Sequence, residues 1–419
     1  MSMRRNLKPR FSMLRSFFLF ASLLSSAVPV ASALTLSLSE IGPRVRAAHP
    51  SLKAARVVVD EARGRQLGSG RLSNPTVVTE FQNESQVSPG SIGISLDQAF
   101  PLTRRLKLER KLSAQLVEAA ELEVRDAERK LVAEAQALAV KLLAVNQQQA
   151  LRQQQTALAG KLSQFANSRA KAGEISALDA TQIEVDNQKL LIESRRLDIE
   201  GITVTGALKP LLGIDPDEPL QMAGELPGMN LPARSASWQQ RADYQSAQRK
   251  VESTDTEIDL AKAKRYSDMS AGLFTAREWQ KTDSRREGTG YVGVRLSLPW
   301  PLWNRNEGEI AEKTASRTRA QLEVIALAAQ IAGEADAARR EMAGHLQLLR
   351  DTQDKVLPRL TDQTTKLEKA YQSGQTDLIT LQRARDLRLQ MEATVIDARR
   401  DFHLARIRYE TAIDKGSTK

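Results

Sequence analysis

Histidine, cysteine and clustered acidic side chains are the residues that most often bind metals or act in catalysis, and this sequence uses few of them. It contains no cysteine and three histidines. His49, His345 and His403 are scattered, and none has a neighbour at the spacing of a metal site. His345, in the segment MAGHLQLL, is interpreted as a residue on a helix surface or in a helix-packing seam.

Sequence motifs for enzymatic chemistry are not found either. There is no glycine-rich loop of the kind that binds phosphates, and there is no nucleophile elbow. The sequence therefore predicts a protein that is not an enzyme and that holds no cofactor and no resident metal.

The N-terminal segment, 1–33, has the pattern of an export signal. A basic stretch precedes the apolar run FFLFASLLSSAVPV, and the small residues ASA at 31–33 fit a cleavage site that would leave Leu34 at the mature N-terminus. The alternative, a membrane anchor, is weaker because the run is short for a span and contains Pro29. Cleavage would remove five basic residues and lower the net charge from +10 to +5. These residues are Arg4, Arg5, Lys8, Arg10 and Arg15.

The composition favours long helices over several compact cores. Aromatic residues make up 4% of the chain, whereas Ala, Leu, Gln, Glu, Lys and Arg fill long stretches, as they do in coiled coils. Basic and acidic residues are interleaved along these stretches, so nucleic acid is not a predicted partner. After the N-terminal segment, no apolar run is long enough for a transmembrane helix.

The chain contains an internal repeat. Residues 98–124 align without a gap with residues 298–324, and residues 168–182 match residues 368–382. The matched parts follow one another in the same order through most of both halves, which indicates a duplicated unit. We predict a first structural repeat at 34–233 and a second at 234–419. Each repeat is expected to contain a helix, two strands and two long helices.

The strands are predicted from period-two alternation. They are expected at about 75–84, 91–100, 268–279 and 289–298. Strands of roughly 8 to 11 residues have the length that crosses a bilayer in a tilted β-barrel. A half-buried strand in a soluble β-sandwich would show the same alternation, so the pattern leaves both interpretations open.

Two stretches, about 105–213 and 307–414, are predicted to form long helices that turn back on themselves. Apolar residues in both recur every three or four positions, which indicates helices that pack along a seam. The first helix should be a rod about 100 Å long, and Pro358 should bend or break the helix in the second half. The seam residues are Leu131, Ala135, Leu138, Leu142 and Val145 in the first half, and Met342, Leu346, Leu349, Val356 and Leu360, with Gln353 between, in the second.

The segment LSLPWPLWNRNEGEI, residues 296–310, connects the last predicted strand to a long helix. Its prolines fix the backbone and keep the preceding residue extended, so the strand stops before the helix begins. Tryptophan rings suit the headgroup layer of a membrane, although they could instead pack inside a soluble joint. The junction residues are Pro299, Trp300, Pro301, Trp303, Asn304 and Arg305, and their counterparts in the first half are Phe100 and Pro101.

Taken together, these features resemble the TolC-like outer-membrane efflux proteins over essentially the whole mature chain. The resemblance rests on the order of elements, on AHPSLKAA near the mature start, on VLPRL in the last helical stretch and on YQSGQTDLITLQRA at a helical turn. The junction at 296–310 is similar to that of the branch serving heavy-metal cation pumps of the cobalt–zinc–cadmium resistance type. This similarity depends on Pro299, Pro301, Leu302, Asn304, Arg305, Asn306 and Gly308.

The resemblance implies a mainly α fold with a membrane β part. Three chains would each give four strands to one twelve-stranded β-barrel, and long helical hairpins would continue it as an α-barrel through the periplasm. The implied location is the outer membrane of a Gram-negative bacterium, and outer-membrane lipid would surround the barrel. The implied partners are two copies of the chain, a periplasmic adaptor (membrane fusion) protein and a proton-driven inner-membrane pump of the RND type. The homotrimer would be a passive exit duct for divalent cations such as cobalt, zinc, cadmium or nickel.

The resemblance also places a periplasmic gate at the two helical turns, around Gly173 and Gly374. Three copies of a charged residue there would form a ring able to select or repel ions. The second turn has Thr380 and Arg383 where the family pattern often has two aspartates, so a contact between Asp179 and Arg383 is one way to close the tip. Solvated charges without a gating role are the alternative. The candidate gate residues are Glu174, Asp179, Asp377 and Arg383.

Two other functions remain open at this point. The same fold could export drugs or serve type I secretion, because the pump and not the duct is expected to choose the cargo. Alternatively, the chain could be a periplasmic coiled-coil structural or adaptor protein with a small β domain and no membrane contact. The duplication and the paired strands in both halves argue against this last interpretation.

Overall fold

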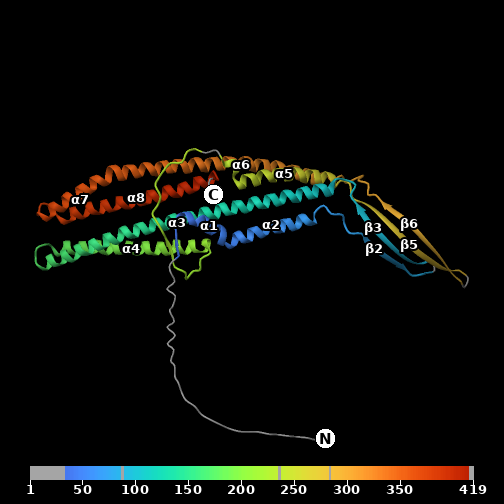
Figure 1. Ribbon diagram of the computed structural model, residues 1–419, viewed down its shortest axis with the longest axis horizontal. Helices are drawn as coiled ribbons and strands as arrows, with labels where there is room; N and C mark the ends of the chain where they lie inside the picture. Colours follow the sequence, from blue (N-terminus) through green and yellow to red (C-terminus); the bar gives the residue numbers. More distant parts are fainter. Residues whose placement is uncertain (1–33, 86–88, 235–236, 283–284, 415–419) are drawn as a thin grey trace, which may run out of the picture.

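The computed structural model describes residues 34–414 except 86–88, 235–236 and 283–284. The predicted export signal lies outside these residues. Figure 1 shows an elongated molecule in which helices run side by side and a sheet extends from one end. The helices are α1 (Leu38–Ala48), α2 (Pro50–Gly68), α3 (Arg105–Lys171), α4 (Ala177–Leu212), α5 (Ala242–Ala263), α6 (Glu307–Arg350), α7 (Leu357–Gln372) and α8 (Leu378–Ala412), with a 3-10 turn, η1 (Ser237–Gln240), and a π-helical turn, η2 (Asp351–Val356).

The strands occur where alternation predicted them, and they form one antiparallel sheet in the order β2-β3-β5-β6. The two halves of the chain meet in the middle of this sheet, where β3 pairs with β5 from Gly90↔Trp279 to Phe100↔Met269. A second, small sheet, which the sequence did not predict, pairs β1 with β4 in parallel. The strands are β1 (Leu34–Leu36), β2 (Thr76–Gln82), β3 (Gly90–Phe100), β4 (Leu220–Met222), β5 (Met269–Thr282) and β6 (Arg285–Ser297).

Helix α3 is the spine of the molecule. It contains 67 residues without a proline, so it is about 100 Å long, as predicted. The predicted seam is buried at Ala135, Leu142 and Val145, but Val132 and Val140 on other sides of the helix are buried as well. A single stripe was too narrow a prediction, because α1, α2, α4, α5 and α8 all pack against α3.

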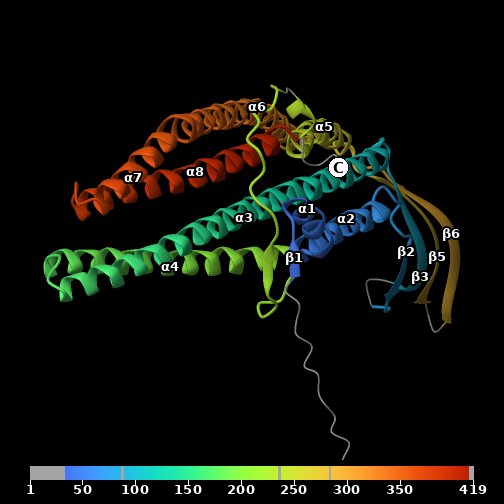
Figure 2. The same ribbon diagram turned by 60° about the vertical axis from the view of Figure 1, so that its left-hand side comes forward.

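Pro358 does not break the second long helix. The chain instead forms the π-helical turn η2, and Pro358 lies in the first turn of α7, where a missing N–H costs little. The axis bends between α6 and α7 (Figure 2). The extra residue of the π turn shifts the buried face, so Thr352 is buried while the predicted seam residue Val356 is 39% exposed. Beyond the turn the seam resumes at Leu360, as predicted.

Shorter helices align end to end beside the long ones. In Figure 1, α4 continues toward α1 and α2, and α8 continues toward α5, so these pairs form rows that run beside α3 and α6. In the first half, the Arg44 side chain donates to the carbonyl of Leu212, the last residue of α4, at 3.3 Å. Gly213, with a φ of 63°, ends α4 against Ala48, and a Cβ at this glycine would lie 2.8 Å from that of Ala48.

In the second half, two buried arginines close the end of α8. Arg129 donates to the carbonyl of Thr411 at 2.9 Å, and Arg241 donates to that of Ala412 at 3.5 Å. Arg241 also binds both carboxylate oxygens of Asp243, at 2.8 and 2.5 Å. Cations at a helix C-terminus are stabilised by the helix dipole, so these side chains join the end of α8 to the start of α5.

The same network controls the ionisation of Asp243. Burial alone would raise the pKa of Asp243, but the hydrogen bonds and charge of Arg241 and the charge of Arg129 lower it overall. A lowered pKa means that Asp243 stabilises the fold above its ordinary pKa, and that this contribution is lost as the pH falls through the folded-state pKa.

We expect Arg241→Met to lower the free energy of unfolding by about 3 kcal/mol, because it leaves Asp243 buried without its main partner. The measurement is denaturant unfolding in detergent, followed by far-ultraviolet circular dichroism. The control is Arg234→Met, which removes an arginine that is 78% exposed and 3.5 Å from Asp336. The control should change stability by less than about 1 kcal/mol. Equal effects of the two substitutions would contradict the role given to Arg241.

Candidate functional site

One face of the β2-β3-β5-β6 sheet is apolar and open. Cross-strand neighbours share a face, and one row across all four strands consists of Val77, Leu96, Leu273 and Val294. These side chains are 65%, 47%, 60% and 67% exposed. The sheet therefore presents its apolar residues outward, with no described part of the chain covering them.

The opposite face is polar and lined with small residues. Ser95 donates to Asp97 at 2.8 Å, and Tyr291 donates to Glu278 at 2.9 Å. The guanidinium of Arg295 lies 5.3 Å from the centre of the Phe274 ring, which itself lies over Gly293. One face of the sheet is thus apolar and the other polar, which is the pattern expected when one face meets lipid and the other meets water.

Aromatic residues mark both ends of the apolar face. At the hairpin end, Phe81 and Trp279 lie on this face with ring centroids 6.4 Å apart. At the helix end, Phe100 is 40% exposed, Trp300 69% and Trp303 94%. The ten steps along β5 between Trp279 and Met269 span about 33 Å. At a strand tilt of about 40° this corresponds to a band about 25 Å high.

The first junction joins β3 to α3. The strand ends at Phe100, Pro101 follows, and α3 begins at Arg105. The Thr103 hydroxyl donates to the carbonyl of Ala263 at 3.2 Å, and the guanidinium of Arg105 lies 2.6 Å from the carboxylate of Asp268. These bonds hold the start of α3 against the end of α5.

The second junction is a tight turn with outward-facing rings. Between Pro299 and Pro301, Trp300 places its carbonyl 2.9 Å from the N–H of Leu302. Since Trp303 is 94% exposed, the alternative in which both rings pack inside a joint does not hold within this chain.

Asn306 closes the second junction. Its backbone is left-handed, with a φ of 60°, which asparagine tolerates better than most residues. Its side chain donates to the carbonyl of Ala261 at 2.8 Å and to Glu309 at 2.6 Å, while its N–H donates to the side chain of Asn304 at 2.9 Å. The carbonyl of Arg305 accepts from Arg265 at 3.2 Å. The sequence placed Asn304 and Arg305 at the junction but did not show that Asn306 makes these bonds.

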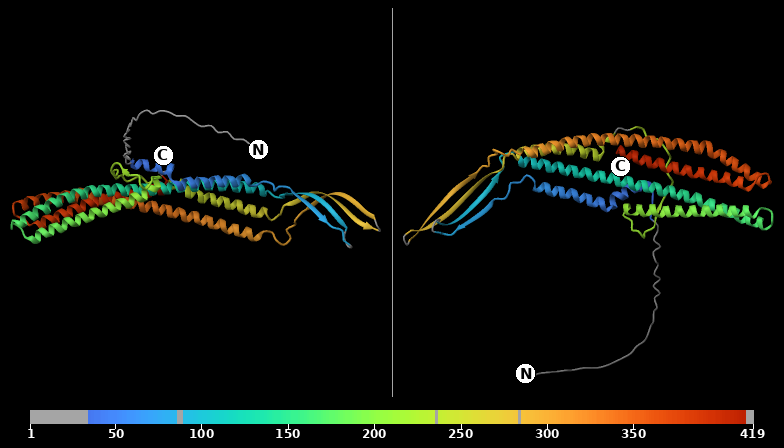
Figure 3. Two further views of the ribbon diagram at one scale, coloured as in Figure 1. Left: turned by 90° about the horizontal axis from the view of Figure 1, so that it is seen from below. Right: turned by 180° about the vertical axis from the view of Figure 1, so that it is seen from behind.

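The two helical turns lie at the end of the molecule opposite the sheet (Figure 3). Gly173 and Gly374 have φ values of 78° and 71°, which glycine adopts without steric cost. An apolar cluster joins the two hairpin ends and includes Ala166, Ala180, Ile183, Leu378 and Leu381. The structure therefore brings the two turns, which belong to different halves of the sequence, to one place.

The four charged residues near these turns have different surroundings. Glu174 lies 3.2 Å from Arg169. Asp377 is the N-cap of α8 and accepts from the N–H and the hydroxyl of Thr380, at 2.7 and 2.9 Å. These bonds, chiefly the one from the N–H, lower the pKa of Asp377. Asp179 and Arg383 form no ion pair with any residue that the structure describes, so the contact considered between them is not made within the chain.

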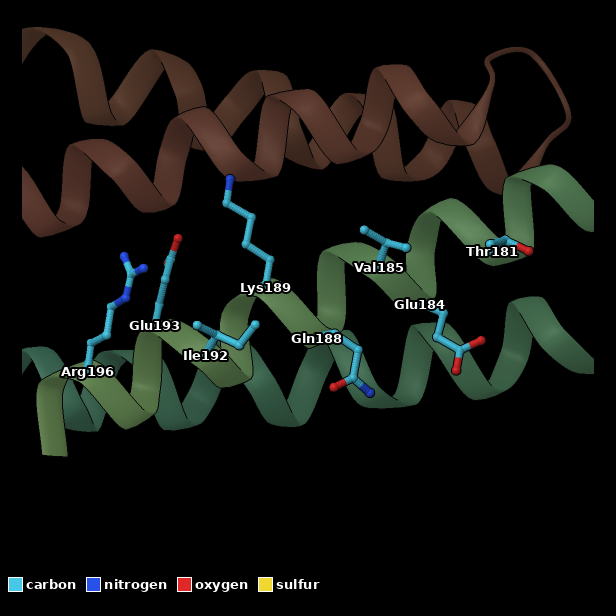
Figure 4. A pocket seen from close by; sticks show the side chains of 8 residues that line it. All are labelled: Thr181, Glu184, Val185, Gln188, Lys189, Ile192, Glu193 and Arg196. Atoms are coloured by element: carbon cyan, nitrogen blue, oxygen red, sulfur yellow. The ribbon is translucent and has the colours of Figure 1, made fainter. Parts of the chain in front are cut away.

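Figure 4 shows a groove along α4 beside these turns. Lys189 points toward the α7–α8 hairpin, while Val185 and Ile192 are 56% and 53% exposed. Leu178 and Ile199, also exposed, continue this line at intervals of seven positions. The groove residues are Thr181, Glu184, Val185, Gln188, Lys189, Ile192, Glu193 and Arg196.

The histidines have structural surroundings. His49 caps α2 by accepting from the N–H of Ser51 at 3.2 Å. His403 is buried and lies 2.8 Å from the carbonyl of Pro227, and burial lowers the pKa of this imidazole. His345 is partly buried on α6, 3.7 Å from Glu341. Within the described ranges, no group of three or more His, Cys, Asp or Glu could hold a metal ion.

In the part of the chain that the structure describes, none of the helices combines the length and the apolar character needed to cross a membrane.

No protein-family model matches the sequence, and no curated protein resembles it closely enough to count as a relative. Solved structures do match. The CmeC outer membrane channel of Campylobacter jejuni has 13% identity and a TM-score of 0.75, with 98% of this chain and 95% of that chain covered. The outer membrane protein VceC of Vibrio cholerae has 16% identity and a TM-score of 0.73, covering 90% and 95%. CusC, described as forming a transmembrane channel, has 17% identity and a TM-score of 0.74, covering 94% and 95%.

At these identities, the likeness shows a shared fold. The predicted fold class, mainly α with long helical hairpins and four strands in the larger sheet, is therefore confirmed.

We expect Asn306→Ala to destabilise the second junction by about 1 to 2 kcal/mol, because alanine disfavours the left-handed backbone and cannot donate to Ala261 or Glu309. The measurement is the thermal unfolding temperature in detergent. Asn306→Gly removes the backbone strain but still lacks the side-chain hydrogen bonds. Its unfolding temperature should therefore lie between that of Asn306→Ala and that of the unchanged chain. If Gly restored full stability, the side-chain bonds would have no measurable role.

Proposed function

We propose that this chain is one subunit of an outer-membrane channel that serves as the passive exit duct of an efflux system. The observation that carries the proposal is the apolar face of the sheet, which is open, spans the height of a hydrocarbon layer and is bounded by aromatic residues at both ends. A soluble protein would be expected to cover so large an apolar surface. The same face argues against a periplasmic coiled-coil protein without membrane contact.

The free edges of the fold support a ring of identical subunits. Strands β2 and β6 are the outer strands of the sheet, and lipid does not tolerate unpaired strand edges. The helical layer ends in the same way, with α4 and α2 at one side and α6 and α7 at the other (Figure 1). The edge strand β2 lies on the same side of the molecule as α2 and α4, and the edge strand β6 lies on the side of α6 and α7. A head-to-tail contact between copies would therefore pair β6 with β2 and cover the exposed line on α4 at once.

The number of copies comes from the resemblance to TolC-like proteins. Three chains would give a twelve-stranded barrel followed by a helical tube in the periplasm. The same resemblance supports a periplasmic adaptor and a proton-driven inner-membrane pump as partners. The junction at 296–310 favours divalent heavy-metal cations as cargo. A ligand cluster is not needed, because tight binding in a duct would slow release. Export of drugs or secreted proteins through the same fold is the second candidate.

Imaging of single particles tests the proposal most directly. The chain is expressed with its N-terminal segment 1–33 in place, extracted from outer membranes in detergent and imaged. We expect a three-fold particle with a short barrel inside the detergent belt and a helical tube about 100 Å long. A water-soluble, elongated particle without a detergent belt would refute membrane insertion.

Two adjacent valines provide a matched control. Val77→Lys puts a charge on the apolar face near its mid-height, at the level of Leu273, whereas Val78→Lys puts the same charge on the polar face, opposite Ser95. A lysine facing lipid at mid-depth costs about 2 to 4 kcal/mol. We expect the amount of trimer in outer membranes to fall for Val77→Lys and to change little for Val78→Lys.

We further propose that the joined helical turns form the periplasmic gate, with Glu174, Asp179, Asp377 and Arg383 around it. Their place at one end of the molecule and the apolar cluster between the hairpins support this proposal. Asp377 has two functions in it. It caps α8, and it contributes a negative charge at neutral pH, where its lowered pKa leaves the carboxylate ionised as in an ordinary aspartate. Arg383 is exposed and available to a neighbouring copy.

Removing either charge should raise the resting conductance of the channel in a planar lipid bilayer. Asp377→Asn is chosen because asparagine caps a helix about as well as aspartate, so the loss of charge is separated from the loss of the cap. Arg383→Gln tests the removal of a positive charge instead of a negative one. The control is Arg319→Gln on α6, an arginine that is 69% exposed and far from the turns. Unchanged closed-state currents in both variants would remove these residues from the gate.

A further inference from the structure

The junctions between sheet and helices carry exposed basic side chains without acidic partners. Arg71 follows the turn after α2, Arg104 and Lys107 lie at the start of α3, and Arg305 lies before α6. All four are exposed, and none forms an ion pair with another described residue. We refer to Arg71, Arg104, Lys107 and Arg305 as the basic collar.

Hydrogen bonds from side chains to backbone carbonyls place the members of the collar at one level of the molecule. The carbonyl of Gly70 accepts from Arg110 at 3.1 and 2.9 Å, so the loop with Arg71 lies against the first turns of α3. Thr103, next to Arg104, is bonded to Ala263. Slightly further along the chain, Arg265 donates to the carbonyl of Arg305. These bonds link all four strand–helix connections in a continuous belt.

Three acids in this belt, Glu109, Asp268 and Glu309, are already occupied, whereas the exposed Glu307 at the start of α6 forms no ion pair with another described residue. Arg105 takes both Glu109, at 3.0 Å, and Asp268, at 2.6 Å. Glu309 is bound by Asn306 and lies 3.2 Å from Lys264. Exposed cations on the helical tube, in contrast, commonly face an acid one helical turn away, as Lys355 faces Asp351 and Lys366 faces Asp362. Some exposed cations on the helices, such as Lys161 and Lys171, also lack an acidic partner, so what distinguishes the collar is its position beside the apolar face of the sheet.

The collar adjoins the aromatic end of the apolar face. Trp300, Leu302 and Trp303 are 69%, 58% and 94% exposed, and Leu72 and Leu102, beside Arg71 and Arg104, are 50% and 48% exposed. Exposed apolar and aromatic side chains next to unpaired arginines match the boundary of a bilayer, where rings lie at headgroup depth and basic groups meet phosphates. Water-soluble polyanions would not explain the apolar residues.

We infer that the basic collar binds the phosphate groups of anionic phospholipids in the inner leaflet of the outer membrane. This inference rests on the proposed function, since it requires the apolar face of the sheet to lie in lipid. Arginine donors match phosphate oxygens in geometry and charge, and the rings of Trp300 and Trp303 occupy the adjoining acyl boundary. The lipid contact would fix the depth at which the sheet gives way to the helical tube.

Tryptophan quenching by brominated lipids tests the inference, because Trp300 and Trp303 adjoin the collar. Trp238 and Trp279 are replaced by phenylalanine, so that Trp300 and Trp303 report alone. The channel, purified from outer membranes, is reconstituted into mixed vesicles of phosphatidylglycerol and phosphatidylcholine in which one or the other carries bromine. Since each basic residue near the surface contributes about 1 kcal/mol, we expect phosphatidylglycerol to be preferred by about fivefold or more.

In the triple variant Arg71→Gln, Arg104→Gln, Arg305→Gln, the preference for phosphatidylglycerol over phosphatidylcholine should fall to a ratio of about one. It should persist in the matched control Lys161→Gln, Lys171→Gln, Lys369→Gln, which removes three exposed, unpaired charges near the helical turns. In the unsubstituted collar, raising the salt to about 1 M should also abolish the preference, because the Debye length falls to about 3 Å. This salt series keeps the test decisive if the triple variant fails to fold.

Three results would overturn the inference in different ways. Equal quenching by both lipids in the unsubstituted collar would show a sheet in the bilayer without selective phosphate binding, and the proposed function would stand. Absence of quenching by either lipid would show that the junction does not meet a membrane, and the proposed function would fail with it. A preference that survives the collar substitutions would assign lipid selection to other residues.

Discussion

Two buried arginines at mid-length hold the molecule in its extended form. Arg129 and Arg241 bind the last carbonyls of α8 and the carboxylate of Asp243, so one helix ends where the next begins. The unbroken helix α3 sets the distance between the sheet and the helical turns, and the alignment of α8 with α5 continues the second row of helices beside it. The corresponding joint in the other half has one hydrogen bond, from Arg44 to Leu212, and the close packing of Gly213 against Ala48. A buried charge network is therefore concentrated where the path of the chain is least constrained by helix geometry.

Different residues hold the two ends of the molecule in place. Along the long helices, small apolar side chains such as Ala135 and Ala139 are fully buried, and ion pairs cover the surface. In the sheet the pattern is reversed, because apolar side chains point outward and polar ones line the other face. Burial against solvent explains the packing of the helices. The sheet is explained only if its apolar face meets lipid, which is why the proposed function depends on it more than on any single side chain.

The duplication did not lead to identical joints. The first strand–helix junction is held by the ion pair between Arg105 and Asp268, whereas the second uses the left-handed Asn306 and its side-chain bonds. The first long helix runs unbroken, whereas the second contains a π turn before Pro358. Similar backbone paths are thus reached by different local chemistry. This difference leaves one half free to carry exposed tryptophans and the other to form the central spine.

The sequence by itself determined the elements and their order, because helix and strand periodicities, prolines and glycines act over a few residues. It predicted the long rod of α3, the strands of the larger sheet and the glycine turns. The tertiary structure decided what depends on contacts between distant segments. It showed burial on several sides of α3, the shift of Val356 out of the seam and the bond from Asn306 to Ala261. Each of these depends on a neighbour far along the chain or on an exact helical register, and local sequence periodicity contains neither.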